Sequence, residues 1–385
     1  MAKHIYLDNA AATPIDPAVV REVVAASKTV GNPSAFNAAG RDAAAVVHRA
    51  RQVVATFLHA HPSEIVFCAS GSEANTLALL GSFPAGETGG VVTTPIEHRS
   101  VLEAVRKLRA AGADVATVQV GPDGVVRAED VVAAITPHTR IVSVMYANNE
   151  VGALQPVARI GAMIARWRRE RKSRFPIFHV DACQAAGYER MDVQRLGVDL
   201  LTFNGTKIYG PRGCAVLFVR RGITVEPRVL GGVQEGGRRA GTEDVANIAG
   251  LAAAVQRVSA VPAARIARLR DRLAEGILKA VPDARIHGPA EGARLPNIVS
   301  VSIPGAHSER LLLELDRFGI SAGSGSACTA HSVESSHVLR AMGVPKRFLE
   351  GVLRFSLSKY TTRQDIDRVI QAFPEVVARA RRTRG

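Results

Sequence analysis

The sequence predicts an α/β fold built on a mainly parallel sheet with helices on both faces. Two observations predict it: short apolar runs alternate with segments of helical periodicity, and each run is apolar throughout instead of alternating with polar residues. Strands of that kind are buried on both faces, as in parallel sheets. The predicted strands are residues 64–68, 90–94, 115–120, 140–145, 176–180 and 199–203, separated mostly by helices such as 99–112 and 156–169.

The length and composition indicate a folded protein of two domains. A chain of 385 residues exceeds the size at which a single hydrophobic core usually stops growing. The hydrophobic fraction of 47% and the charged fraction of 22% are ordinary for a globular protein and exclude a disordered chain.

The formal net charge of +14 raises the question of a nucleic-acid partner. Basic residues cluster at 166–174, where they continue an amphipathic helical pattern, and at 379–384. We predict a solvated helix face for the first cluster and a fraying tail for the second. No basic motif interleaved with aromatic residues is present, so we expect no stable nucleic-acid partner. Acidic substrates or acidic protein partners fit the charge.

The cysteines indicate a reducing compartment. Cys68, Cys183, Cys214 and Cys328 are too few and too scattered for a disulfide framework, and no C-x-x-C pair indicates a metal site. We predict that Cys68 and Cys214 are core residues, and we assign no role to Cys183. The sequence shows no apolar signal core and no apolar run of about 18 residues, so we expect a cytoplasmic protein without membrane contact.

Polar residues follow the predicted strands at the ends where parallel sheets bind ligands. After strand 64–68, a small-residue turn with Gly71 and Ser72 opens a helix, and the N–H groups at a helix N-terminus can bind phosphate. Each of these residues alone has an ordinary explanation as a cap or a turn, but all of them map to one edge of one sheet. The side chains that follow the other strands are His98, Asn149, Asp181, Gln184, Asn204 and Lys207.

This combination is the set of groups that pyridoxal 5'-phosphate (PLP) requires. A lysine amine holds the cofactor, an aspartate keeps its pyridine nitrogen protonated, and a helix N-terminus binds its phosphate. Lys207, Asp181 and the turn at 71–72 supply these three groups. We therefore predict PLP as the cofactor.

One thiol lies in a run of small residues that an ordinary core would not use. The run begins Ser-Ala-Gly-Ser-Gly-Ser-Ala at Ser321 and leads to Cys328. Since Gly- and Ser-rich segments are flexible, we interpret residues 321–336 as a mobile loop that carries a reactive cysteine. A loop cysteine and a strand-end lysine together indicate covalent chemistry. We predict that His331 and His337, near this loop, are surface histidines.

With these motifs the sequence resembles the NifS/IscS-like cysteine desulfurases, which are fold-type I PLP-dependent enzymes of the class-V aminotransferase family. The resemblance extends nearly from end to end, and the Ser-Gly-Ser-Ala-Cys-Thr match is specific to the branch with a long cysteine loop. The matching segments are residues 6–14, 31–34, 148–152, 179–184, 207–211, 240–243, 324–329 and 354–357.

The resemblance implies roles around the cofactor. Lys207 would hold PLP and move protons, and Asp181 would face the pyridine nitrogen. Gln184 and Asn149 would approach the ring hydroxyl, and His98 would stack on the ring and act as an acid or base. The residues implied near the phosphate are Gly71, Ser72, Asn204, Thr206 and, from the other subunit of a homodimer, Thr242.

The resemblance also implies the reaction. Arg354, with Asn149, would bind the carboxylate of L-cysteine. Cys328 would attack the substrate sulfur, so that L-alanine leaves and a persulfide forms on Cys328. The persulfide sulfur would then pass to an acceptor protein for iron–sulfur assembly or thiolation.

The implied architecture is a large domain with a seven-stranded, mainly parallel sheet and a smaller α+β domain. We expect the large PLP-binding domain at residues 15–258, and the small domain at 1–14 and 259–385, with a helix at 262–280, a strand at 297–303 and a helix at 363–381. Three positions depart from the family pattern: Asn37 and Thr206 stand where histidines are usual, and Gly236 stands where an arginine is usual.

Two alternatives stay open on the sequence alone. A selenocysteine lyase or an aminotransferase would use the same fold, although Cys328 in its loop disfavours the aminotransferase. A basic scaffold that binds RNA or protein, with reduced activity, is the alternative from another functional class.

Overall fold

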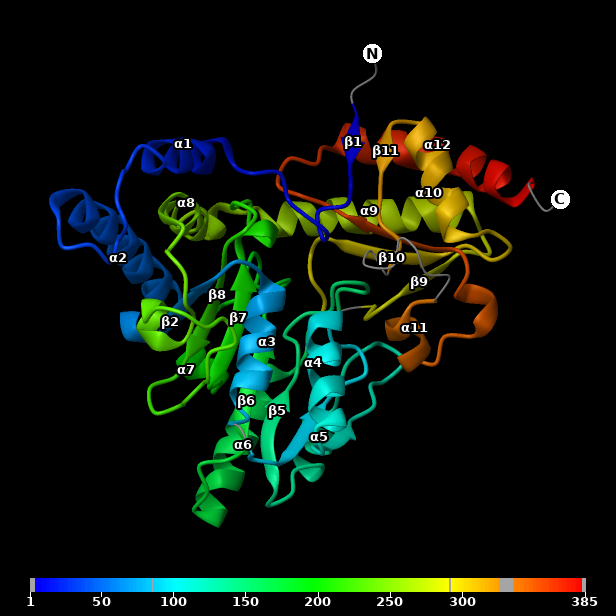
Figure 1. The fold of residues 1–385 in the computed structure, drawn as a ribbon. Coiled ribbons are helices and arrows are strands. Elements are labelled where there is room, and N and C mark those ends of the chain that lie inside the picture. Colours follow the sequence, from blue (N-terminus) through cyan, green and yellow to red (C-terminus); the bar gives the residue numbers. More distant parts are fainter. Residues whose placement is uncertain (1–3, 85, 291, 326–334, 383–385) are drawn as a thin grey trace.

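A computed structural model describes residues 4–84, 86–290, 292–325 and 335–382 of the chain. Helices surround a seven-stranded, a three-stranded and a two-stranded sheet, which confirms the predicted α/β class (Figure 1). The strands are β1 Ile5–Tyr6, β2 Ile65–Cys68, β3 Gly90–Thr93, β4 Asp114–Thr117, β5 Thr139–Ser143, β6 Ile177–Asp181, β7 Leu200–Asn204, β8 Ala215–Val219, β9 Arg285–His287, β10 Ile298–Ser302, β11 Ile320–Ser321 and β12 Val352–Ser356. The α-helices are α1 Pro17–Ala26, α2 Ala38–Leu58, α3 Gly71–Gly81, α4 Arg99–Ala110, α5 Ala128–Ala133, α6 Val157–Arg171, α7 Val193–Leu196, α8 Val245–Val255, α9 Ala263–Ala280, α10 Ser308–Arg317, α11 His337–Ala341 and α12 Arg363–Arg382.

The seven-stranded sheet has the strand order β2-β8-β7-β6-β5-β3-β4. Strand β8 is antiparallel to both of its neighbours, and the remaining pairs are parallel. Every strand except β8 therefore points the same way. As a result, the carboxyl ends of β2, β3, β5, β6 and β7 lie along one edge of the sheet.

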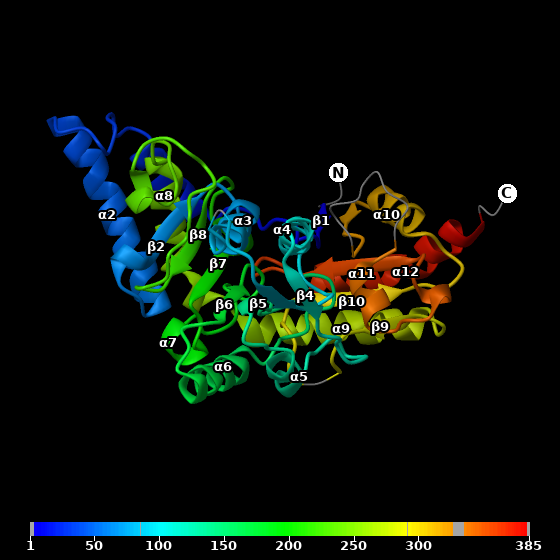
Figure 2. The ribbon, with the colours of Figure 1, turned by 60° about the horizontal axis from the view of Figure 1, so that its bottom comes forward.

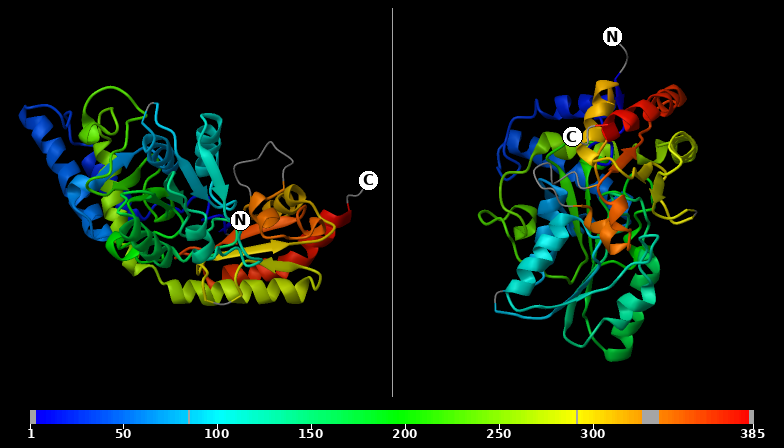
Figure 3. Two further views of the ribbon diagram at one scale, coloured as in Figure 1. Left: turned by 90° about the horizontal axis from the view of Figure 1, so that it is seen from below. Right: turned by 90° about the vertical axis from the view of Figure 1, so that its right-hand side faces the viewer.

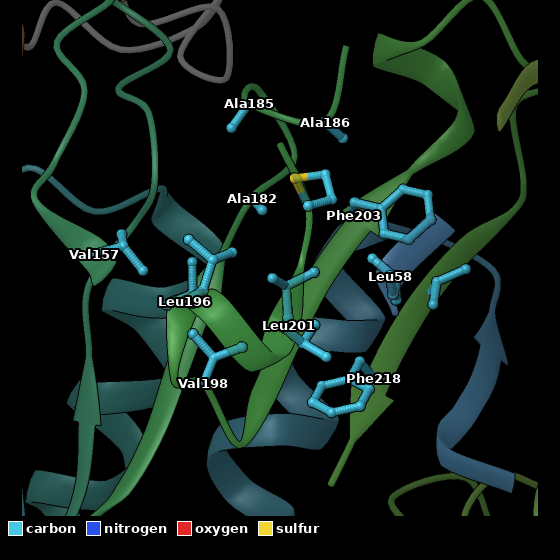
Figure 4. Close-up of a cluster of buried hydrophobic side chains, with 14 of the residues drawn as sticks. Leu58, Val157, Ala182, Ala185, Ala186, Leu196, Val198, Leu201, Phe203 and Phe218 are labelled. Atoms are coloured by element: carbon cyan, nitrogen blue, oxygen red, sulfur yellow. The ribbon is translucent and has the colours of Figure 1, made fainter. Parts of the chain in front are cut away.

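Helices cover both faces of this sheet because its strands are apolar on both sides. In β7, Leu200 packs with residues of α3 and α4, whereas its neighbour Leu201 packs with residues of α2, α6 and α8. Figure 2 shows α3 and α4 on one side of the sheet and α6 on the other. In the core of the second face, Phe203 and Phe218 lie close to Leu58 of α2 (Figure 4).

A second buried cluster surrounds the three-stranded sheet β12-β10-β9. It is formed by α9, α10 and α12 together with Ile5 and Leu7 near the start of the chain. Helix α9 extends from the large sheet to this smaller one (Figure 3). Strand β1 pairs with β11 in parallel, so the first and last parts of the chain share one core.

The end of the chain differs from the sequence-based prediction. Residues 379–382 belong to the helix α12 and do not form a fraying tail. Arg381 donates hydrogen bonds to Asp283 and to the carbonyl of Pro304, which holds this turn on the core. Within the described residues, no helix combines the length and the apolar character needed to cross a bilayer.

Glu235 anchors the loop between β8 and α8. Its side chain is 1% exposed. It accepts hydrogen bonds from Arg51 at 2.7 and 2.8 Å and from the backbone N–H of Phe67 at 3.0 Å. The next residue, Gly236, has a φ of +66°, a conformation that glycine adopts without strain. The departure from the family arginine thus lies at a position where the backbone favours glycine.

We predict that Glu235→Ala lowers the free energy of unfolding by about 3 kcal/mol, because it leaves the partly buried guanidinium of Arg51 without its carboxylate. Glu103→Ala, in an ion pair whose side chains are 75% and 60% exposed, is the control and should change stability by less than about 0.5 kcal/mol. Urea unfolding measures both values. Equal effects of the two substitutions would show that the Arg51–Glu235 pair does not anchor the loop.

Candidate active site

The strand ends of the large sheet bring predicted site residues together. Asp181 and Asn204 are the last residues of β6 and β7, and Lys207 ends the short 3₁₀ helix Gly205–Lys207 that follows β7. Gly71 is the first residue of α3, after β2. His98 is the N-cap of α4, after β3. All five lie at the edge where the parallel strands end.

These residues line one cavity of about 400 Å³. Side chains and backbone from the N-terminal segment, the large sheet and β12 contribute to its walls. The predicted site residues that line it are Gly71, Ser72, His98, Asn149, Asp181, Gln184, Asn204, Lys207 and Arg354.

Three predicted residues are not among the described residues that line this cavity. Thr206 uses its carbonyl to accept hydrogen bonds from the N–H and hydroxyl of Thr13. Thr242 lies in an exposed loop before α8. Cys328 lies outside the described residues, and Gly325, just before that gap, lines the cavity.

Asp181 is a buried charged group that hydrogen bonds hold in place. It is 5% exposed. Its Oδ2 accepts a hydrogen bond from Asn75 Nδ2 at 2.7 Å, and its Oδ1 accepts one from the backbone N–H of Cys183 at 3.0 Å. A carboxylate with both oxygens bonded has a fixed orientation, as a partner for a ring nitrogen requires.

Lys207 presents an amine whose charge is disfavoured. Its Nζ donates a hydrogen bond to the carbonyl of Ala11. Burial lowers the pKa of Lys207 below its ordinary value, and the nearby Arg354 guanidinium lowers it further. A larger fraction of the amine is therefore neutral near pH 7, the form that acts as a nucleophile or a base.

Arg354 carries a buried positive charge next to the cavity. Its side chain is 2% exposed. Nη2 donates to Asp8 Oδ1 at 2.8 Å, and Nη1 donates to the carbonyl of Asn149 at 3.0 Å. Nε has no hydrogen-bond partner within the described part of the chain. The guanidinium thus retains a donor for a further acceptor such as a carboxylate.

Two buried carboxyl groups lie near the site, Glu150 in the cavity lining and Glu97 next to His98 in the chain. Burial raises the pKa of Glu97 to about 8 and the pKa of Glu150 to about 7. Glu97 Oε1 accepts hydrogen bonds from the Thr94 hydroxyl at 2.6 Å and the backbone N–H of Met145 at 2.9 Å. Glu150 Oε2 accepts a hydrogen bond from Ser336. Near pH 7, Glu97 is therefore mostly protonated, whereas Glu150 is partly ionised.

His337 corrects a sequence-based prediction. It is partly buried and lines the cavity, whereas we expected a surface histidine. Its Nε2 lies 3.0 Å from the carbonyl oxygen of Glu97, and its Nδ1 lies 3.9 Å from Glu150 Oε1. Helix α11 packs against residues of the large sheet's loops, and this packing turns His337 inward.

Cys183 lies at the floor of the cavity next to the start of α3. Its Sγ accepts a hydrogen bond from Asn204 Nδ2 at 3.5 Å. A Cβ atom added to Gly71 would lie 2.9 Å from both Cys183 Sγ and Asn204 Nδ2, so this close approach requires glycine. Burial raises the pKa of the Cys183 thiol well above its ordinary value, which keeps it neutral and poorly nucleophilic.

Several lining residues were not assigned a role from the sequence. Glu150 and His337 reach the cavity from segments far apart in the chain, and no sequence pattern indicates that contact. Asn75 did carry a signal, because it lies one helical turn after Gly71 on the same face of α3.

Comparisons with known proteins show which family this chain resembles. The chain matches the model of the aminotransferase class-V family over residues 5–369. A cysteine desulfurase of Trichormus azollae is 41% identical over 382 residues, which are 98% of this chain and 94% of that protein. A solved NifS-like protein has a TM-score of 0.89 at 33% identity and covers 98% of this chain and 100% of its own. The structure of SspA in complex with cysteine has a TM-score of 0.80 at 30% identity and covers 93% of this chain and 100% of its own.

The similarity in sequence covers nearly the whole chain and both cores, and the solved NifS-like structure shares the fold of this chain. The chain therefore belongs to the class-V aminotransferase family and, within it, to the PLP-dependent cysteine desulfurases.

Proposed function

We propose that this enzyme converts L-cysteine to L-alanine and that Cys328 receives the sulfur as a persulfide. The observation that carries the proposal is the cavity itself, which is lined by the buried carboxylate of Asp181, the amine of Lys207 and the buried guanidinium of Arg354. The similarity to SspA, whose structure contains cysteine, supports L-cysteine as the substrate.

The residues of the cavity fit PLP. The amine of Lys207 and the carboxylate of Asp181 line the same cavity, and PLP requires one group for its attachment and the other for its ring nitrogen. The N-terminus of α3 offers N–H groups and a positive dipole end to a phosphate at Gly71 and Ser72. Asp181 would then face the ring nitrogen. When bound, PLP withdraws electrons from the α-carbon of an amino-acid substrate.

The chain's own residues would bind the substrate and move its protons. Arg354 and Asn149 would hold the substrate carboxylate, and the retained donor of Arg354 supports that role. Lys207 would hold the cofactor and, as a neutral amine, remove the α-proton. Gln184 would approach the ring hydroxyl, and its Nε2 is fixed by a hydrogen bond to the carbonyl of Ala10 at 2.9 Å.

The sulfur transfer would be a displacement at the substrate sulfur. The Cys328 thiolate attacks that sulfur, an S–S bond forms and the C–S bond breaks. The electron pair of the broken bond stays on carbon, which takes up a proton to become the methyl group of alanine. L-cysteine and a thiol thus give L-alanine and a persulfide without an external oxidant. The persulfide would pass to an acceptor protein for iron–sulfur assembly or thiolation.

We also propose a homodimer in which Thr242 approaches the phosphate of the partner's site. The loop that carries Thr242 exposes large apolar side chains, with Leu230 at 80% and Val233 at 85% exposure. Such residues are usually covered at an interface. A second copy of the chain would cover them and bring Thr242 to a cavity that it does not line in its own chain.

We also propose a division into two domains and a reducing compartment. The buried cluster of Ile5, Leu7 and residues from α9, α10 and α12 supports a small domain of residues 1–14 and 259–385 beside a large domain of 15–258. Cys68, Cys183 and Cys214 are buried free thiols, which supports a reducing compartment such as the cytoplasm.

The decisive experiment is to incubate the purified protein with L-cysteine and a reductant and to assay alanine and sulfide together. Equal amounts of both products support the proposal. Transfer of the amino group to a keto acid, or turnover of L-selenocysteine but not of L-cysteine, would assign one of the two alternative reactions. Salt-sensitive RNA binding without alanine would favour the scaffold.

We predict that Lys207→Ala abolishes the visible absorption band of the protein, because the cofactor loses its covalent attachment. Lys279→Ala, on the exposed side of α9, is the control and should keep the band. Borohydride treatment followed by mass spectrometry should place the reduced cofactor on the peptide of Lys207. An unchanged band in Lys207→Ala would remove this lysine from its proposed role.

We predict that Cys328→Ala retains PLP and still binds L-cysteine, because Lys207, Asp181 and Arg354 remain in place. Cysteine-dependent alanine formation should fall by more than the roughly 10²–10⁴-fold that is typical for the loss of an acid or base. Mass spectrometry of the wild-type protein should map the persulfide to Cys328. A persulfide on Cys183, or desulfurase turnover in the variant, would contradict the mechanism.

We predict that Thr242→Ala raises the PLP dissociation constant of the dimeric protein roughly tenfold, because one hydrogen bond to a charged group is lost. Sedimentation measures the oligomeric state, and gel filtration followed by absorption measures the retained cofactor. A monomer with full PLP occupancy would argue against a shared site.

A further inference from the structure

Asn75 connects two proposed site residues on different elements. It lies in the first part of α3 and is 1% exposed. Its Nδ2 donates one hydrogen bond to Asp181 Oδ2 at 2.7 Å and another to Ser100 Oγ at 3.0 Å. A carboxylate oxygen only accepts hydrogen bonds, so the NH₂ group and not the carbonyl of Asn75 must face Asp181. The orientation of the amide is therefore determined.

The hydroxyl of Ser100 connects Asn75 to His98, and its donor direction follows from the orientation of the Asn75 amide. Because Ser100 Oγ accepts from Asn75, its own proton is available for donation. His98 Nδ1 lies 2.8 Å from Ser100 Oγ. The backbone N–H of Ser100, which can only donate, also points to Nδ1 at 3.2 Å. Two donors converge on one ring nitrogen, which must then be the acceptor.

We propose that Asn75 is a positioning residue that aligns Asp181 and, through Ser100, holds neutral His98 in the tautomer protonated at Nε2. The inference follows from the hydrogen bonds that connect Asn75 to Asp181 and, through Ser100, to His98. The role of Asn75 in catalysis rests on the proposed function. Because His98 lines the cavity, the tautomer decides which way a proton can move there.

The tautomer divides the proton chemistry between two residues. A neutral His98 with Nε2 protonated can give a proton at that atom but cannot accept one there. Removal of the α-proton then belongs to Lys207, whose pKa is lowered by burial. His98 would act as the acid. The tautomer of His98 thus assigns the role of acid to His98 and the role of base to Lys207, whereas the resemblance allowed His98 either role.

The chain contains a matched control for the local part of this arrangement. His61 caps a short 3₁₀ helix, and its Nδ1 contacts Ser63 Oγ at 2.8 Å and the backbone N–H of Ser63 at 3.2 Å. This exposed pair has the same two distances but lies outside the cavity lining. The difference at His98 is the additional donor, Asn75, which fixes the hydroxyl of Ser100 and ties it to Asp181.

The first test is nuclear magnetic resonance of the holoenzyme labelled with ¹⁵N-histidine. The signal of His98 is assigned by its loss in His98→Gln and is read at a pH where the imidazole rings are neutral. We expect Nε2 protonated and Nδ1 unprotonated. A His98 signal with Nδ1 protonated would overturn the proposal. The result does not depend on alanine formation, so failure of the proposed function and failure of this inference are distinguishable.

The second test separates the two hydrogen bonds of Asn75. Asn75→Ala should raise the PLP dissociation constant about tenfold, through Asp181, and should mix the tautomers of His98. Ser100→Ala keeps the backbone N–H donor but loses the shorter hydroxyl contact, so it should partly mix the tautomers and lower kcat by about tenfold with little change in KM or in PLP affinity. Ser100→Thr should keep the wild-type signal. Ser63→Ala should leave His98 unchanged. Unmixed tautomers in Ser100→Ala, or unchanged PLP affinity in Asn75→Ala, would refute the positioning role.

Discussion

The buried charge of Arg354 is the constraint around which the two cores of the molecule meet. A guanidinium that is 2% exposed requires a carboxylate partner, since an unpaired buried charge costs several kcal/mol. Asp8 supplies that partner, at 2.8 Å, from the start of the chain. The ion pair therefore draws residues 8–13 between β12 of the small sheet and the strand ends of the large one. In that position the carbonyls of Ala10 and Ala11 accept hydrogen bonds from Gln184 and Lys207.

The same edge of the sheet collects polar atoms whose hydrogen-bonding capacity is not used up. Asn75 Oδ1, Asn204 Oδ1, Glu97 Oε2 and Arg354 Nε are buried and have no partner among the described residues. Each such atom costs about 1–3 kcal/mol, so a fold that depended only on packing would avoid them. Asn75, Asn204 and Arg354 line the cavity, where a bound ligand would reduce these costs.

The sequence predicted which residues lie together at the strand ends, because the carboxyl ends of parallel strands lie at one edge of a sheet. Asp181, Asn204 and Lys207 follow apolar runs, and runs of that kind end at one edge. The sequence did not predict that Ser336 contacts Glu150 or that His337 contacts the carbonyl of Glu97. Both contacts join segments that are far apart in the chain. The frayed tail predicted at 379–384 was wrong for residues 379–382 because the bonds of Arg381 to Asp283 and Pro304 depend on tertiary packing.

Asn37 shows that a departure from the family pattern can have a local explanation. In place of a histidine, this asparagine is the N-cap of α2, and its side chain accepts a hydrogen bond from the N–H of Gly40 at 2.9 Å. Asparagine is among the best residues for that position, so the substitution stabilises the start of a helix of 21 residues. Thr206 accepts hydrogen bonds from Thr13 only through its backbone carbonyl, so its side chain has no such local explanation. Neither contact involves the cavity.

The charges around the cavity favour an anionic substrate at neutral pH. At pH 7, Glu97 is mostly protonated and Glu150 is only partly ionised, because burial raises their pKa values to about 8 and about 7. Asp181 is held by Asn75 and a backbone N–H, and the charge of Arg354 is shared with Asp8. What remains to attract a carboxylate is the retained Nε donor of Arg354 and the N-terminus of α3 for a phosphate. As the pH rises through the pKa of Glu150, a new negative charge appears beside Arg354, and binding of an anionic substrate should weaken for that electrostatic reason.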